Sequence, residues 1–147
     1  MLKESLLEIF ERDLTKLGEE INLYPDETRL WIVEKDISNS AGNLCLHLIG
    51  NLNHFIGSVL GNTGYVRERD KEFSTKSTPR HELLNHIEQT KKMVNDTLNN
   101  LTDEDLQKDF PIDKWKRKAT TGFLLMHLSS HLSYHLGQIN YHRRLLA

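Results

Sequence analysis

The sequence has little that would cross-link it covalently or hold it in a membrane. Of its 147 residues only Cys45 is a cysteine, so no disulfide can form within the chain, and a reducing cytoplasm is the expected compartment. No apolar run reaches the ~20 residues that a membrane-spanning helix needs, and we expect no membrane association. The first ten residues, MLKESLLEIF, carry charges inside their apolar run, which is not typical of a signal peptide.

An excess of charge of either sign is also lacking. Lysine and arginine number 19 against 21 aspartates and glutamates, which gives a formal net charge of −2. The longest strongly basic run, KWKRK from Lys114 to Lys118, is short and resembles a solvated helix entry. A nucleic-acid-binding domain normally carries a basic face, so we expect no nucleic-acid partner.

Proline and glycine are scarce, and apolar residues recur at spacings of three and four, which indicates amphipathic helices. The pattern predicts a single all-α domain over residues 1–147, a four-helix bundle with long loops between its helices. The four predicted helices run from Leu2 to about Tyr24, from Ser38–Ser40 to about Leu60, from Pro79 to about Leu101, and from Ala119 or Thr120 almost to the end.

The connections are less regular. Residues Asp26 to Asn39 fit either one short helical turn or an extended segment, and Gly61 to Thr78 is predicted to be a long loop. Within that loop, the charged side chains are expected to form surface ion pairs: Arg67, Arg69, Asp70 and Glu72. Thr102 and Asp105 are spaced as a capped turn.

Chemistry concentrates in the last predicted helix, where His127, His131 and His135 recur every four residues. Side chains four apart lie on one helical face, and an i, i+4 histidine pair can hold one transition-metal ion. Spacing alone fits the pair His127 and His131 as well as the pair His131 and His135. Two ligands leave a site incomplete, so a further ligand is expected on another helix, where His47 and His54 are the candidates.

Two segments resemble the DinB-like, or YfiT-like, superfamily of four-helix-bundle proteins. One is Leu46-His47-Leu48 within LCLHLIGN, and the other is the H-x-x-x-H-x-G-Q element from His131 to Gln138. The stretches SNSAGNLCLHLIGNLNHFI and RERDKEF add to the resemblance with a branch of mostly unassigned function, and the resemblance covers nearly the whole chain.

The resemblance implies that His47, His131 and His135 hold a divalent metal with positions left open, for which zinc and nickel both suit histidine ligands. Characterised relatives include metal-dependent thiol S-transferases that use a low-molecular-weight thiol, and others resemble hydrolases. It therefore implies a metal-dependent enzyme acting on a small molecule, and a homodimer, since relatives often pair through helix faces. The alternative is a metal-binding or stress-response dimer without turnover.

The remaining candidates have supporting or structural interpretations. His54 and His127 are candidates to support the ligands, and Gln138 is a candidate to orient one of them. Gly137, inside a helix, predicts close packing of another helix there. Four residues are assigned structural or solvent-facing places: Cys45 in the core, His142 near the helix end, and His81 and His86 in solvent.

Overall fold

A computed structural model describes all residues, 1–147, and every regular element in it is a helix. The first helix, α1 (Leu2–Asn22), follows the predicted apolar pattern, and it buries Leu6, Phe10, Leu14, Leu17 and Ile21. It ends two residues before the predicted Tyr24, with Leu23 as its C-cap. The all-α class predicted from the sequence is confirmed.

The segment after α1 combines both structures that its sequence allowed. Asp26 caps a short 3₁₀-helix, η1 (Glu27–Trp31), by accepting a hydrogen bond from the backbone N–H of Thr28. No helix follows between Ile32 and Ser40, so this part of the connection bridges from α1 to the next helix without regular structure.

The second long helix starts where the sequence predicts. Ser40 caps α2 (Ala41–Leu52) by accepting a hydrogen bond from the Asn43 N–H, and the chain continues without a break as a π-helix, η2 (Asn53–Leu60). The change of helix type falls at Asn53, whose side-chain amide donates both to the Ile49 carbonyl and to Thr90 Oγ1. Side-chain insertion of this kind is a common cause of local widening in a helix.

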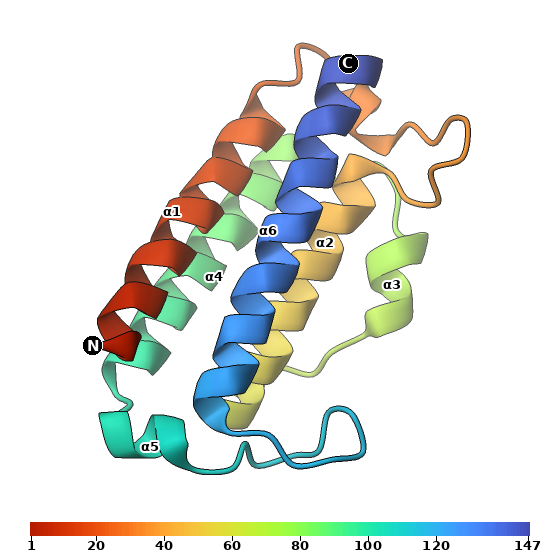
Figure 1. Ribbon diagram of the computed structural model, residues 1–147. Coiled ribbons are helices and arrows are strands. Elements are labelled where there is room, and N and C mark those ends of the chain that lie inside the picture. Colours follow the sequence, from red (N-terminus) through yellow and green to blue (C-terminus); the bar gives the residue numbers. More distant parts are fainter.

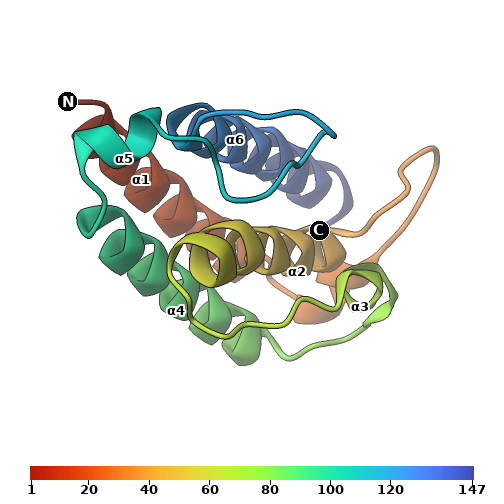
Figure 2. The same ribbon diagram turned by 90° about the horizontal axis from the view of Figure 1, so that it is seen from below.

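The predicted loop from Gly61 to Thr78 is only partly a loop. Its charged run forms a short helix, α3 (Arg69–Ser74), which lies against the outer side of α2 (Figures 1 and 2). The third long helix, α4 (Arg80–Asn99), begins after Pro79. Thr102 and Asp105 form the predicted capping box at the start of α5 (Asp103–Gln107).

The last helix, α6 (Thr121–Leu146), is capped by Thr120 and runs almost to the end of the chain. Four long helical segments lie alongside one another: α1 contacts α4 and α6, and α2 contacts α4 and α6 (Figure 1). α2 and α6 run in opposite directions, so the middle of α2 faces the middle of α6 (Figure 1). No helix is long and apolar enough to cross a membrane.

Buried polar groups fix how α6 sits on α1. The Glu20 carboxylate, 2% exposed, accepts hydrogen bonds from Arg143 Nε at 2.8 Å and from Asn140 Nδ2 at 2.8 Å. A buried carboxylate is costly unless it is paired and hydrogen-bonded. This contact therefore favours one rotation of α6 about its axis and one position of α6 along α1. That position determines which face of α6 is presented to α2.

His142 lies near the end of α6, as predicted, but it is buried and only 7% exposed. Its Nε2 lies 2.9 Å from the Ile32 carbonyl and its Nδ1 lies 2.7 Å from the Tyr24 hydroxyl. Nε2–H therefore donates to the carbonyl, and Nδ1 accepts from the hydroxyl. The sequence does not predict this burial, because both partners are far away in sequence, on the segment after α1.

Replacing Tyr24 with phenylalanine removes the hydroxyl and leaves the buried His142 Nδ1 without a donor. We expect Tyr24→Phe to lower the free energy of unfolding by about 1–3 kcal/mol, the cost of an unsatisfied buried acceptor. Urea denaturation followed by circular dichroism measures this. Tyr141→Phe, at a side chain that is 62% exposed, is the control and should change stability by less than about 0.5 kcal/mol. Equal effects of the two substitutions would contradict the assignment.

Candidate metal centre

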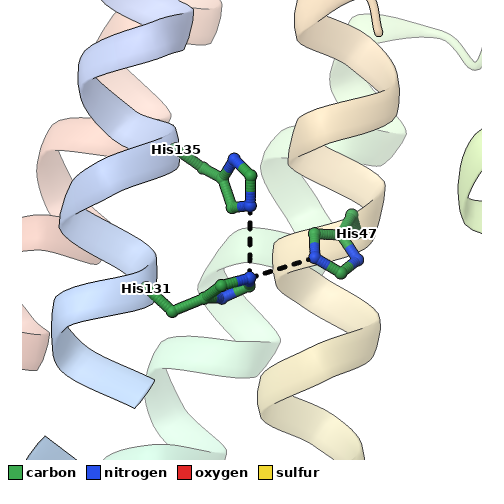
Figure 3. Close-up of side chains that lie close together, drawn as sticks. All are labelled: His47, His131 and His135. Atoms are coloured by element: carbon green, nitrogen blue, oxygen red, sulfur yellow. Dashed lines mark hydrogen bonds between the residues drawn. The ribbon is translucent and has the colours of Figure 1, made fainter. Parts of the chain in front are cut away.

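Three histidines meet where α2 faces α6. His131 and His135 are one turn apart on α6, and because this helix is continuous their side chains project in nearly the same direction. His47 projects toward them from the middle of α2 (Figure 3). The structure thus brings together the three residues named by the family resemblance, and it favours the pair His131 and His135 over the pair His127 and His131.

The Nε2 atoms of these histidines converge on one point. His131 Nε2 lies 3.2 Å from His47 Nε2 and 3.2 Å from His135 Nε2, and one ligand atom of each residue lies within 4.8 Å of the others. The rings meet edge to edge or edge to face, with interplanar angles of 77°, 86° and 89°. The short distances between the Nε2 atoms show that ring nitrogens border the shared space.

Two of the three nitrogen–nitrogen distances fit a small divalent ion. Four-coordinate zinc binds histidine nitrogen at ~2.0–2.1 Å, which places two tetrahedral ligand nitrogens ~3.3–3.4 Å apart. The two shorter nitrogen–nitrogen distances in this centre are 3.2 Å. Three protein nitrogens can hold a metal and leave a coordination position for another molecule, which is the arrangement of catalytic rather than closed structural sites.

His47 is held in the ligand orientation by a buried carboxylate. Its Nδ1 lies 3.0 Å from Oε1 of Glu72, a side chain that is 6% exposed. With Nδ1–H donating to Glu72, the Nε2 lone pair is free to face the centre. A metal-bound histidine commonly has such a carboxylate partner, which fixes the tautomer and makes the ligand more basic.

Arg67 donates two hydrogen bonds to the Glu72 carboxylate, from Nε to Oε2 at 2.8 Å and from Nη2 to Oε1 at 3.0 Å. Burial acts to raise the pKa of Glu72, but the hydrogen bonds from His47 and Arg67 outweigh it and hold the pKa below its ordinary value. Glu72 is therefore an anion at neutral pH. Its negative charge favours a cation at the far side of the His47 ring.

The prediction of surface ion pairs for the charged run is wrong. Arg67 and Glu72 do form an ion pair, but Glu72 is buried and Arg67 is partly buried, whereas Arg69 and Asp70 are exposed and form no ion pair. A run of charged residues resembles solvated surface, and nothing local in it shows that one turn of helix directs Glu72 inward. The signal that points to it is its resemblance to the family segment, RERDKEF, not its charge pattern.

α2 carries two residues that place Glu72. Asn43 Nδ2 donates to the backbone carbonyl of Glu72 at 2.9 Å and to that of Thr75 at 2.8 Å, which fastens α3 to α2. Gly50 leaves the space into which the carboxylate reaches, since a Cβ built there would collide with Glu72 Oε2. Neither Asn43 nor Gly50 carries a local sequence pattern that predicts a place in the site.

His135 has its own partner on α6. Its Nδ1 lies 2.7 Å from Oε1 of Gln138, so Gln138 accepts the Nδ1–H and leaves Nε2 facing the centre. This is the contact expected of a residue that orients a ligand. The prediction that another helix packs closely against the neighbouring Gly137 is wrong, because a Cβ there would meet nothing within 4 Å.

His131 lies between the other two ligands, with its Nε2 3.2 Å from the Nε2 of each. Burial, together with His135 and His47, lowers its pKa to about 3, so the ring is neutral at pH 7. Neutral imidazole is the form that binds a metal. Its Nδ1 is buried and has no hydrogen-bond partner, so His131 differs from the other two in lacking an orienting acceptor.

The other histidines lie outside the centre. The His127 ring packs against Trp115 at 4.7 Å between centroids and is 6.4 Å from the His131 ring, and the His54 ring packs against Phe55. Neither makes a hydrogen bond to a residue of the centre, and burial lowers the pKa of both. His81 and His86 are exposed, as predicted.

A cavity of about 380 Å³ adjoins one end of the centre. His135 and Gln138 line it from α6, Leu44 lines it from α2, and Ile37 closes it from the connection after η1. Its size is within the range of small-molecule sites. The centre therefore has room beside it for an organic ligand.

Gly50→Ala tests whether the position of Glu72 sets the affinity of the centre. The added methyl group must displace the carboxylate from His47, and the loss of such a supporting contact typically weakens metal binding 10–100-fold. Competition with a chromophoric chelator measures the dissociation constant for zinc. Gly137→Ala, also in a helix but in open space, is the matched control and should leave the affinity unchanged. Equal affinities in all three proteins would show that Glu72 does not support the centre.

Comparison with known proteins gives a family but no activity. Residues 4–147 match the family model described as a protein of unknown function, DUF1572. No curated protein matches the chain. The family match spans α2, α3 and α6, the three elements that build the histidine centre. The chain is a member of the DUF1572 family.

Proposed function

We propose that this protein is a divalent-metal-dependent enzyme of the DinB-like superfamily, built as a four-helix bundle. Four long helical segments packed alongside one another support the fold assignment. The L-x-H segment on α2 and the H-x-x-x-H-x-G-Q element on α6 support the superfamily assignment, because their histidines meet at one point.

The observation that carries the proposal is the orientation of the ligand nitrogens. Histidines that gathered for packing alone would need no buried carboxylate behind them. Here Glu72 accepts from His47 Nδ1 and Gln138 accepts from His135 Nδ1, so two Nε2 lone pairs are directed to the same place as His131 Nε2. The three Nε2 atoms thus border one space, which a bound cation would fill.

A bound zinc or nickel ion would polarise a substrate group or lower the pKa of a coordinated thiol or water. His47, His131 and His135 would hold the ion. Glu72 orients His47 and Gln138 orients His135 through hydrogen bonds to their Nδ1 atoms. Arg67 keeps Glu72 ionised.

We favour thiol transfer over hydrolysis, with the thiol supplied from outside. Cys45 is the only thiol in the chain, and it is fully buried. Burial raises its pKa to about 12, so it is not a thiolate at neutral pH and cannot act as the nucleophile. The resemblance to thiol S-transferases supports a low-molecular-weight thiol as the co-substrate, and the cavity beside His135 offers space for a small reactant.

The first test is metal content by elemental mass spectrometry on untagged protein. We expect about one equivalent of zinc or nickel, by analogy with other three-histidine sites, and its loss in His47→Ala and in His131→Ala. His86→Ala, at an exposed histidine of α4, is the control and should retain the metal. The loaded protein should transfer small thiols to an electrophilic dye, and the two ligand variants should not.

No metal in the wild-type protein, even after reconstitution, would overturn the metal centre. Full metal content with no thiol transfer or hydrolysis would instead favour the non-catalytic metal-binding dimer. The metal content thus tests the metal centre, and the turnover assay tests separately whether the centre is catalytic.

We also propose a homodimer formed through α6. One stripe of this helix exposes large apolar side chains at Phe123, Met126, Tyr134 and Tyr141, which are 48%, 53%, 59% and 62% exposed. Their spacings of three, seven and eight place them on a single face. The open space beside Gly137, on the same face, allows a second helix to approach closely.

Met126→Glu places a charge in the middle of this stripe and should convert the dimer to a monomer at micromolar concentration. Sedimentation equilibrium measures the mass of both proteins. Lys92→Glu, a charge change on the exposed side of α4, should leave the mass unchanged. A strictly monomeric wild-type protein at the same concentration would contradict the dimer.

A further inference from the structure

Cationic side chains gather around the histidine centre from two separate parts of the chain. On α3, Arg69 Cζ lies 5.3 Å from the centre of the Phe73 ring, and the Phe73 ring lies 4.9 Å from that of His47. Arg69 is thus one aromatic ring removed from a ligand. Arg67 is closer still, with Nη2 3.5 Å from His47 Nδ1, but its charge is matched by Glu72.

The second group comes from the segment between α5 and α6. Lys114 Nζ lies 5.1 Å from the centres of both the Phe55 and the Trp115 rings, and the Arg117 Cζ lies 5.4 Å from the Trp115 ring. The Trp115 ring in turn packs against His127, whose ring stacks near His131. These contacts place Lys114 and Arg117 on the side of the centre where His131 lies.

The base of this segment is closed by backbone hydrogen bonds. Phe110 N–H donates to the Ala119 carbonyl at 2.8 Å, and Thr121 N–H donates to the Lys108 carbonyl at 2.8 Å. The intervening residues therefore leave and return at one place at the start of α6. This anchoring and the contacts with two aromatic rings hold Lys114 in place beside Phe55 and Trp115.

Three of these cations have no counter-charge. Arg69, Lys114 and Arg117, here called the cationic rim, form no ion pair, and the nearby exposed Asp70 and Asp113 pair with none of them. The chain as a whole has a net charge of −2, so this local excess of positive charge is opposite in sign to the whole. Arg67 and Arg69 contribute to lowering the pKa of Lys114, after burial, which agrees with their closeness.

We propose that the cationic rim binds the carboxylate or phosphate group of the small-molecule substrate whose reacting atom is placed at the histidine centre. This rests on the proposed function, because the rim orients a molecule that the centre activates. Lys114 is partly buried, where an uncompensated positive charge is costly, and a bound anion removes that cost. The rim is too small and too closely flanked by acidic side chains for a polyanion, which favours one anionic group on a small molecule.

A pair of matched thiols tests the rim directly. 3-Mercaptopropanesulfonate and 3-mercapto-1-propanol share the same thiol and chain length, and they differ in one negative charge on a group that binds metals weakly. Titrating each into the cobalt(II)-loaded protein gives a thiolate-to-cobalt absorption band, from which both dissociation constants follow.

We expect the sulfonate to bind about tenfold more tightly, the effect of one favourable charge contact at a partly exposed site. Lys114→Gln and Arg69→Gln should each reduce this preference and leave the affinity for the uncharged thiol unchanged. Lys92→Gln, far along α4 and paired with Asp96, is the control and should retain the full preference. Added sodium chloride should weaken binding of the sulfonate alone.

Equal affinities for the two thiols in the wild-type protein would overturn the rim while leaving the metal centre in place. Absence of the absorption band with both thiols would overturn thiol activation at the centre, and the inference with it. Competition by acetate or by inorganic phosphate then identifies the natural group: the anion that displaces the sulfonate at lower concentration is the better match to the rim.

Discussion

The histidine centre depends on the buried hydrogen bond between Glu72 and His47. A carboxylate at 6% exposure is unfavourable by itself, and it is stabilised here by Arg67 on one side and His47 on the other. That requirement explains features that otherwise look unrelated: a short helix outside the bundle, an asparagine that fastens it to α2, and a glycine that leaves room for the carboxylate. Each of them serves to place one negative charge behind one imidazole.

The parts of the site that the sequence predicted are those governed by local periodicity. His131 and His135 share a face because helix geometry repeats every 3.6 residues, and any continuous helix would align them. Periodicity fits the pair His127 and His131 equally well, and only the family resemblance selects His135 and, over His54, His47. The starts of α2 and α6, at the caps Ser40 and Thr120, could also be predicted, because capping depends on residues within three positions of each other.

The parts that the sequence did not predict depend on contacts between distant segments. Glu72 lies 25 residues from its partner His47, inside a run whose composition is typical of solvated surface. His142 lies 118 residues from Tyr24. Gly50 and Gly137 are both glycines within helices, yet only the first faces a neighbour, and no property of either residue distinguishes them. Which helix face meets which side chain is decided by packing, and local patterns do not contain it.

The metal ligands and the cationic rim lie on different elements, and this separation affects how such a centre can come to bind a particular substrate. The metal-ligating histidines sit on two long helices whose positions are fixed by the core and by Glu20. The cationic rim instead sits on the short helix α3 and on the segment before α6, which contribute little to that core. Loops and short elements on a rigid scaffold can vary without disturbing it. Changes in the rim can therefore alter which anion is selected while the ligand geometry stays the same, so that metal affinity and substrate choice are separable properties of this fold.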